Sequence, residues 1–297
     1  MKPIIFLGSI ALIFLACSSS KLSMKTLENQ IHQEFASTPD IQYALAFKDL
    51  QTNRTVLINA KASFHAASTM KTPVLAEVYR QAESGKYSVH DSVVVKNEFK
   101  SIADGSSYTL SVGDDSEPAL YKHLGKKVSI YHLAYQMIIR SSNLATNILI
   151  EKIGADQVMQ LMKSIGANDI RVLRGVEDNK AYELGMNNTT TAYDLMLLFE
   201  KIANGELVSR QASEEMIKIL LDQHFGEIIP AQLPAGTKVA HKTGSISTVN
   251  HDSGIVFLPD GRKYVIVLLS RFKPGNSKIA VETMAGVSKS VWDFMER

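Results

Sequence analysis

The stretch Ala67-Ser68-Thr69-Met70-Lys71-Thr72-Pro73 places a hydroxyl group three residues before an amine. Positions i and i+3 of a helix lie on one face, about 5–6 Å apart at Cβ, so the spacing predicts that Ser68 and Lys71 share a face of a helix over 64–84. A serine is a weak nucleophile until a neighbouring base takes its proton, and burial can leave a lysine neutral enough to act as that base. Since an ordinary surface helix turn can carry the same pattern, the other motifs must decide between the two interpretations.

The composition is that of a soluble globular protein. The 297 residues, of which 45% are hydrophobic and 21% charged, suffice for one large domain or two small ones. A formal net charge of +2 gives no electrostatic reason to expect a nucleic-acid partner. Four histidines lack metal-ligand spacing and are interpreted as structural or incidental: His65, His123, His241 and His251. We therefore expect neither a metal nor an organic cofactor.

The N-terminus has the pattern of a secretory signal. A short positive start precedes an apolar run over 4–15, which is too short to span a bilayer of about 30 Å. Leu15-Ala16-Cys17 followed by three serines resembles a bacterial lipoprotein signal; the alternative is an ordinary secretion signal with an incidental cysteine. We expect a signal peptide over 1–16, a linker over 17–23, and a periplasmic protein anchored to the membrane by a lipid on Cys17, the only cysteine.

Hydrophobic periodicity predicts strands near both ends of the chain and helices between them. Strands are predicted over 42–49, 55–59, 238–243, 254–258 and 264–270, with shorter ones over 92–96 and 108–112. Helices are predicted over 24–35, 64–84, 129–140, 143–152, 155–165, 192–203, 213–221 and 277–296. A polar, irregular loop is predicted over 174–188, and loops of that length inside compact domains are usually functional.

The order of these elements predicts one antiparallel sheet built from both chain termini and packed between helices. We therefore expect an α+β fold, a three-layer α/β/α sandwich, into which an all-helical subdomain is inserted. The expected domain covers 24–297. Its α/β part is 24–85 together with 222–297, and its helical part is 86–221.

Three further stretches strengthen the interpretation of the Ser68 pair. Ser141-Ser142-Asn143 lies between two predicted helices, Glu177 lies in the long loop, and Lys242-Thr243-Gly244-Ser245 ends a predicted strand. In this order, Ser-x-x-Lys, Ser-x-Asn and Lys-Thr-Gly resemble the signature of class A serine β-lactamases and penicillin-binding proteins. The resemblance extends to the stretches 118–124, 143–147, 189–192 and 233–234. It implies the β-lactamase/transpeptidase-like fold for the chain from about residue 27 onward.

The same resemblance implies catalytic roles. Ser68 would attack the carbonyl of a lactam or amide, and Lys71 would be its base or part of a proton relay with Glu177, because the acylation base of this family is disputed. Ser141 would pass a proton to the departing nitrogen, and Glu177 would activate the water that hydrolyses the acyl-enzyme. The backbone N–H groups of Ser68 and Ser245 would stabilise the oxyanion.

The resemblance also implies substrate-binding roles. Asn143 would bind the amide side chain of the substrate, and Gly244 would let the substrate lie against the strand edge. Lys242, with Thr243 and Ser245, would attract the substrate carboxylate.

Simpler interpretations exist for several of these residues: Ser141 and Ser142 as a helix N-cap pair, Glu177 as a solvated loop acid with Asp178 and Glu183 as competitors, and Lys242-Thr243 as an ordinary strand end. Asn147 is expected to be a buried amide that holds loop backbone.

The chain departs from the family pattern at several positions. Ala181 stands four residues after Glu177, where the family usually has an asparagine that holds the hydrolytic water. Ser142 replaces the middle aspartate of Ser-Asp-Asn, and Ser116 stands where an aromatic wall is usual. Ile246 follows the Lys-Thr-Gly-Ser motif in place of a frequent glycine. These departures concern deacylation and substrate fit rather than acylation.

The expected function is hydrolysis of a β-lactam antibiotic through an acyl-Ser68 intermediate, and hence antibiotic resistance, by a protein expected to be a monomer. One alternative is a serine DD-peptidase or esterase acting on cell-wall peptides. Another is a sensor of β-lactams or peptidoglycan fragments that is acylated without turnover. Glu177 favours the enzyme that deacylates, whereas Ala181 weakly favours something other than an efficient lactamase.

Overall fold

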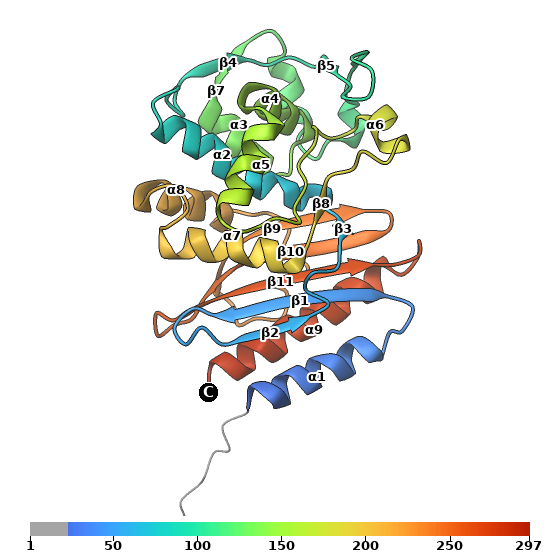
Figure 1. The fold of residues 1–297 in the computed structure, drawn as a ribbon, viewed down its shortest axis with the longest axis vertical. Coiled ribbons are helices and arrows are strands. Elements are labelled where there is room, and N and C mark those ends of the chain that lie inside the picture. Colours follow the sequence, from blue (N-terminus) through green and yellow to red (C-terminus); the bar gives the residue numbers. More distant parts are fainter. Residues whose placement is uncertain (1–22) are drawn as a thin grey trace, which may run out of the picture.

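The computed structural model describes residues 23–297, which form a sheet between two helical layers (Figure 1). The expected signal peptide, Cys17 and all but the last residue of the expected linker lie outside the described residues. Within 23–297, no helix combines the length and the apolar character needed to cross a membrane.

One antiparallel sheet of five strands joins the two ends of the chain. The strands in spatial order are β2 (Thr55–Ile58), β1 (Gln42–Asp49), β11 (Lys263–Arg271), β10 (Val249–Phe257) and β9 (Lys238–Ile246). In the register, Leu45 on β1 pairs with Leu268 on β11. The predicted sheet is confirmed, and β9 forms one of its edges.

The sheet is buried on both faces, because side chains on each strand alternate between two cores. On β1, Ala44 and Ala46 face one core, whereas Leu45 and Phe47 face the other, which also contains Trp292. Helices α1 (Met24–Ala36) and α9 (Ser277–Met295) cover the second face, and α7 (Ala192–Asn204) lies against the first. The three-layer sandwich expected from the sequence is therefore confirmed.

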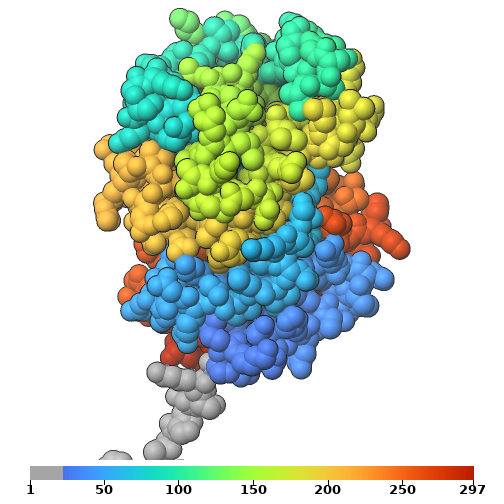
Figure 2. All heavy atoms as spheres, viewed as in Figure 1, coloured from blue at the N-terminus to red at the C-terminus, as the bar shows by residue number. Residues whose placement is uncertain are grey.

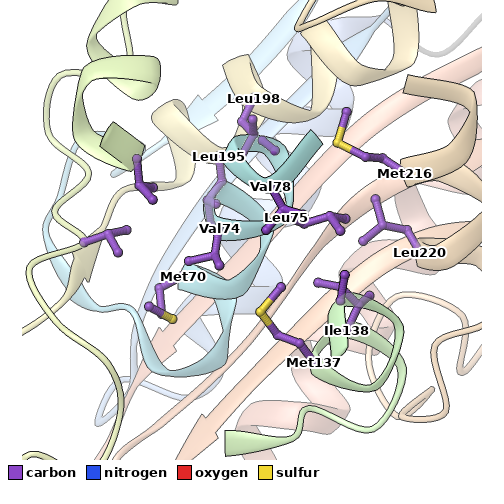
Figure 3. Close-up of a cluster of buried hydrophobic side chains, with 14 of the residues drawn as sticks. Met70, Val74, Leu75, Val78, Met137, Ile138, Leu195, Leu198, Met216 and Leu220 are labelled. Carbon is purple, nitrogen blue, oxygen red and sulfur yellow. The ribbon is translucent and has the colours of Figure 1, made fainter. Parts of the chain in front are cut away.

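Helix α2 (Lys71–Glu83) is the centre of the first core. Figure 3 shows its apolar side chains among those of three other helices: α3 (Ile130–Ile139), α7 and α8 (Arg210–Leu221). Two more helices of this half of the molecule are α4 (Asn143–Ile153) and α5 (Ala155–Ser164). In Figure 2 this half, largely green, lies above the blue N-terminal part of the sheet. The packing holds the first turn of α2 firmly at the boundary between the two halves.

The inserted part is not all-helical. It contains two short antiparallel pairs: β4 (Ser92–Val94) with β7 (Lys127–Ser129), and β5 (Phe99–Lys100) with β6 (Ser107–Tyr108). Two 3₁₀ turns follow β6: η2 (Val112–Asp114) and η3 (Pro118–His123). The strand predicted over 108–112 is therefore wrong beyond its first residue. Helix α8 begins earlier than predicted because the Ser209 side chain caps it by accepting from the N–H of Ala212.

Two other predictions need correction near the site. The helix predicted over 64–84 is divided into β3 (Phe64–His65), which pairs with β8 (Thr189–Thr190), then the 3₁₀ turn η1 (Ala67–Met70), and then α2. Ala67 has a φ of +45°, which a continuous helix does not allow. The irregular loop over 174–188 contains a short helix, α6 (Asn179–Glu183), because the Asp178 side chain caps it.

Candidate active site

Ser68 lies on the 3₁₀ turn η1, directly before α2, rather than inside a long helix. The side chain of His65 stabilises the start of this turn, because its Nδ1 accepts a hydrogen bond of 3.0 Å from the N–H of Ala67. The carbonyl of His65 in turn accepts from Nε2 of the buried His251 at 2.9 Å. The half-buried Ser68 side chain is thereby presented at the boundary between the sheet and the helical half.

Lys71 is fully buried at the start of α2. Its Nζ donates to the carbonyl oxygen of Ser141 at 2.6 Å, to Oγ of Ser141 at 3.2 Å and to Oδ1 of Asn143 at 2.8 Å. Burial lowers the pKa of Lys71 to about 7, although the carboxylates of Asp115 and Glu177 act in the opposite direction. A large fraction of this amine is therefore neutral at physiological pH, as a general base requires. Within 23–297 its hydrogen bonds do not include Oγ of Ser68.

Ser141 lies between two buried lysines. Its Oγ accepts from Nζ of Lys71 at 3.2 Å and from Nζ of Lys242 at 3.1 Å. A hydroxyl has two acceptor positions and one proton, so with both positions occupied the proton of Ser141 is free to be donated elsewhere. Ser141 also has a φ of +58°, a strained conformation of the kind that is enriched at functional sites.

The side chain of Asn143 connects Lys71 to Glu177. Its Oδ1 accepts from Lys71, and its Nδ2 donates to Oε1 of Glu177 at 2.5 Å. Burial is the main cause that raises the pKa of Glu177, against the stabilising hydrogen bond from Asn143. A carboxylate with a raised pKa is a better proton acceptor, so Glu177 has the environment of a general base. Its φ of +60° gives Glu177, like Ala67 and Ser141, a strained backbone conformation at the site.

Two buried side chains hold the loop that carries Glu177. Asn147 accepts from the N–H of Val176 at 2.7 Å and donates to the carbonyl of Val176 at 3.0 Å, which confirms the role expected for it. Asp178 accepts from Oγ of Ser101 at 2.7 Å and from the N–H of Ile102 at 2.9 Å. The residues before and after Glu177 are thus fastened to α4 and to the β5–β6 connection, which fixes the position of its carboxylate.

The Lys-Thr-Gly-Ser motif lies within β9, which continues to Ile246 instead of ending at Thr243 as predicted. Lys242 is fully buried and also donates to the carbonyl of Thr243 at 2.9 Å. Burial, and after it the nearby Lys71, hold the pKa of Lys242 well below its usual range. Oγ of Ser245 donates to Oδ1 of Asn250 across the sheet at 2.8 Å.

Gly244 brings β9 into close contact with the turn that carries Ser68. A Cβ at this position would lie 3.0 Å from the backbone nitrogens of both Ser68 and Thr69. That distance is shorter than ordinary van der Waals contact, and the nearest atoms are backbone, which cannot rotate away. Only a glycine therefore allows the strand edge and the Ser68 turn to approach this closely.

Replacing Gly244 by alanine should push β9 away from Ser68 and lower kcat/KM by about 10²-fold, since a displacement of about 1 Å has that effect on positioned groups. Steady-state kinetics and a thermal melt of the variant test this. The matched control is Gly286→Ala in α9, where the nearest atom lies 3.5 Å from the new Cβ. Activity of Gly244→Ala equal to that of the control would contradict the role given to Gly244.

The cleft consists of two hollows that meet at Ser68. One, of about 320 Å³, lies under the Glu177 loop and is lined by residues that include His65, Tyr182 and Ile246. The other, of about 230 Å³, is lined by residues that include Ser141, Phe225 and Thr243. Every catalytic or binding residue predicted from the sequence, Cys17 aside, is either on these walls or hydrogen-bonded to a residue on them. Among the described residues, no cluster of three or more His, Cys, Asp or Glu side chains could hold a metal ion.

One buried acid beside the site was missed by the sequence reasoning. Asp115 lies among five polar or turn-forming residues over 114–118, a composition that indicates a polar turn. In the structure it is only 6% exposed and accepts a hydrogen bond of 2.8 Å from the N–H of Leu144 on α4. Nothing in the local pattern distinguishes it from its exposed neighbour Asp114.

Comparison with known proteins agrees with this architecture. The profile of the Beta-lactamase enzyme family matches residues 26–295. The β-lactamase VEB-1 of Pseudomonas aeruginosa is 24% identical over 251 residues, which cover 81% of each chain. The solved structure of PBP-A is 25% identical and superposes with a TM-score of 0.78, covering 92% of this chain and 97% of PBP-A. The structure of the TLA-3 extended-spectrum β-lactamase is 22% identical and superposes with a TM-score of 0.82, covering 93% of this chain and 100% of TLA-3. At that identity, the similarity to TLA-3 is evidence for the shared fold only. Because the family profile matches nearly its whole length, the chain belongs to the Beta-lactamase enzyme family.

Proposed function

We propose that the protein hydrolyses β-lactams by a serine mechanism of the class A type. The observation that carries the proposal is the connected set of hydrogen bonds from Lys242 through Ser141, Lys71 and Asn143 to Glu177. The set joins a buried amine whose pKa is about 7 to a carboxylate with a raised pKa, and that carboxylate lines the same hollow as Ser68. Relatives such as VEB-1 are β-lactamases, which supports the same substrate class here.

In the proposed acylation step, Oγ of Ser68 attacks the lactam carbonyl carbon and gives its proton to Lys71, directly or through a relay that includes Glu177. The oxyanion is stabilised by N–H groups at Ser68 and Ser245. Ser141 donates its proton to the lactam nitrogen as the C–N bond breaks, and Lys71 returns a proton to Ser141. The product is an ester between Ser68 and the opened substrate, with no net change of protons on the protein.

In the proposed deacylation step, Glu177 takes a proton from a water molecule as the water oxygen attacks the ester carbonyl. The ester C–O bond then breaks, and the proton passes to Oγ of Ser68, which restores the free enzyme. Substrate binding would use the same cleft. A substrate carboxylate near Lys242, Thr243 and Ser245 would place a negative charge beside the buried amine of Lys242 and would thereby favour its protonated form.

The rate of acylation should rise with pH through about 7 and then level off. Lys71 must be neutral to accept the proton of Ser68, and its pKa is about 7, so below that pH the protonated amine is inactive as a base. Rapid-quench measurement of the covalent adduct across pH gives this profile directly. An acylation rate that does not change through this range would contradict the assignment of Lys71 as the base.

A penicillin-binding protein that deacylates slowly is the second candidate. PBP-A is among the structures similar to this chain, and a mutant of PBP-A has been solved as an acyl-enzyme complex with penicillin G. Ala181, buried on α6 four residues after Glu177, offers no polar group to hold a hydrolytic water. This observation concerns deacylation only, so the two candidates share the acylation step and differ in the lifetime of the ester.

Steady-state hydrolysis of a chromogenic cephalosporin, compared with cleavage of a peptide ending in D-Ala-D-Ala, distinguishes the two candidates. Sustained colour with many turnovers per protein molecule supports the lactamase. A single burst of colour equal to the protein concentration, with cleavage of the peptide, supports the penicillin-binding protein instead. Absence of both reactions would contradict the serine mechanism proposed for Ser68.

A further inference from the structure

The carboxylate of Asp115 is buried and fully occupied by hydrogen bonds from three parts of the chain. Its Oδ2 accepts from the N–H of Leu144 at 2.8 Å, from the hydroxyl of Tyr121 at 3.2 Å and from Oγ of Ser142 at 3.4 Å. Its Oδ1 accepts from the N–H of Glu117 at 2.9 Å. A buried carboxylate with four donors has a fixed position, so it can in turn fix the groups that donate to it.

Two of these donors lie on either side of Asn143. Leu144 is the second residue of α4, where backbone N–H groups lack partners within the helix and a negative charge is favourable. Ser142 is the N-cap of the same helix, and its Oγ also accepts from the N–H of Ala145 at 3.2 Å. Asp115 therefore holds the start of α4 from outside the helix.

The segment held in this way carries the groups that orient the catalytic lysine. The carbonyl and Oγ of Ser141 and the amide oxygen of Asn143 receive all three hydrogen bonds of Lys71. Ser141 has a left-handed backbone conformation, which persists only when the surrounding structure holds it. A small shift of 141–144 would thus move both the partners of Lys71 and the proton donor Ser141.

We propose that Asp115 is a positioning residue for acylation: it holds the Ser141–Leu144 segment so that Lys71 stays aimed for proton transfer, and it contributes a negative charge near that amine. The inference rests on the serine mechanism proposed above and extends it to a residue outside the motifs. Ser142 occupies the middle position of the Ser-x-Asn motif and donates to Asp115. The connection between η2 and η3 thus supplies a carboxylate beside a motif that contains none.

The charges around Lys71 give this proposal a measurable signature. Glu177 from its loop and Asp115 from the η2–η3 connection both favour the protonated amine, whereas Lys242 on β9 opposes it when it is itself protonated. Removing the charge of Asp115 should therefore lower the pKa of Lys71 below about 7. The acidic limb of the acylation profile would then move to lower pH, which a purely structural helix cap would not cause.

The test compares Asp115→Ala, Asp115→Asn and the control Asp156→Asn, which removes a charge from the exposed first turn of α5. The probe is benzylpenicillin, and the quantity is the second-order rate constant of adduct formation, measured by rapid quench and intact mass between about pH 5 and about pH 9. We expect Asp115→Ala to slow acylation by about 10- to 100-fold. We expect Asp115→Asn, which keeps the size and an acceptor oxygen, to shift the acidic limb down by roughly half a pH unit or more.

A double variant adds a rescue. The variant Asp115→Ser, Ser142→Asp exchanges the two side chains that share the 3.4 Å hydrogen bond, so that the carboxylate lies at position 142 and the hydroxyl at position 115. Aspartate caps a helix as well as serine does, so the cap of α4 is kept. We expect this double variant to acylate faster than Asp115→Ser alone. A double variant no faster than the single one, with the limb of Asp115→Asn at its parent pH, would overturn the proposal.

The outcomes separate this inference from the function on which it rests. If the parent protein forms no adduct, the serine mechanism fails and the inference fails with it. If the parent is acylated and all Asp115 variants match it in rate and in pH profile, only the inference fails. If Asp115→Ala does not fold, the pH of the acidic limb in the acylation profile of Asp115→Asn decides whether the inference holds.

Discussion

Replacing Ser68 by alanine should abolish covalent labelling by β-lactams and reduce their hydrolysis by about 10⁴- to 10⁶-fold, the range expected when a catalytic nucleophile is removed. The reason is that Ser68 is the nucleophile of the proposed mechanism, and two other hydroxyls of the cleft are engaged elsewhere: Ser141 accepts from two lysines, and Ser245 donates to Asn250. Intact mass after incubation with benzylpenicillin and initial rates with a chromogenic cephalosporin measure the two effects.

The control for this variant is Ser84→Ala, at the far end of α2, where the hydroxyl donates only to the carbonyl of Gln81. It should retain the parent rate. Both variants should melt near the parent temperature, because neither change leaves a buried polar group without a partner. A Ser68→Ala protein that is still labelled, or that turns over at more than about one-hundredth of the parent rate, would show that the nucleophile lies elsewhere.

Replacing Glu177 by glutamine should trap the acyl-enzyme. Glutamine keeps the acceptor oxygen for Nδ2 of Asn143 but cannot take a proton from water, so deacylation should slow by about 10²- to 10⁴-fold while labelling of Ser68 continues. Time-resolved intact mass would show a stable adduct where the parent shows a transient one. If Glu177 also relays protons during acylation, labelling should slow as well, but by a smaller factor than deacylation.

Glu183→Gln is the matched control, because it changes the other glutamate of the same loop. Glu183 is exposed at the end of α6 and takes no part in the hydrogen bonds around Lys71. Its variant should behave like the parent. Parent-like turnover by Glu177→Gln, or an equal effect in both variants, would remove Glu177 from the mechanism.

Much of the fold could be predicted because its determinants are local. The apolar runs of β1 and β11 and the helical period of α1, α3, α4 and α9 each indicate their element without knowledge of the rest. Strand β10 begins at Val249, five residues before the strand predicted over 254–258, and the prediction missed its first half because that half is polar in sequence. The threonine that caps α7 and the serine that caps α4 are equally local signals. In the inserted part, β4 falls within the strand predicted over 92–96, whereas β5 and β7 are two and three residues long, which is too short for a periodic pattern to appear.

The geometry of the site was less predictable, because tertiary contacts impose it. Ala67, Ser141 and Glu177 all have positive φ values, although none is a glycine or an asparagine. Alanine has a high helix propensity, so nothing at position 67 indicates the break in the helix predicted over 64–84. The contacts that override this preference come from His65 and His251 at the turn, which are close in space but far apart in the sequence.

The buried charge of Asp115 was equally hard to predict from the sequence, because it too depends on tertiary contacts. Its burial depends on the packing of the η3 turn against α4, and its partners Tyr121 and Leu144 lie on different elements. The role of Asn147 could be expected because the resemblance placed it on the helix behind the loop, and the structure shows its amide on the backbone of Val176. The resemblance to a known family thus predicted the residues of the motifs. Asp115 lies outside every motif, and its place beside the site became visible only in the three-dimensional structure.

The most direct test of the account is the mass of the parent protein followed over time after addition of a chromogenic cephalosporin, with Ser68→Ala as the reference. The account predicts an adduct on Ser68 that appears, is cleared as the substrate is consumed, and is accompanied by sustained colour, because Lys71 and Glu177 serve the two halves of the reaction. An adduct that persists after a single burst of colour would contradict hydrolysis, and the absence of any adduct or colour would contradict the serine mechanism itself.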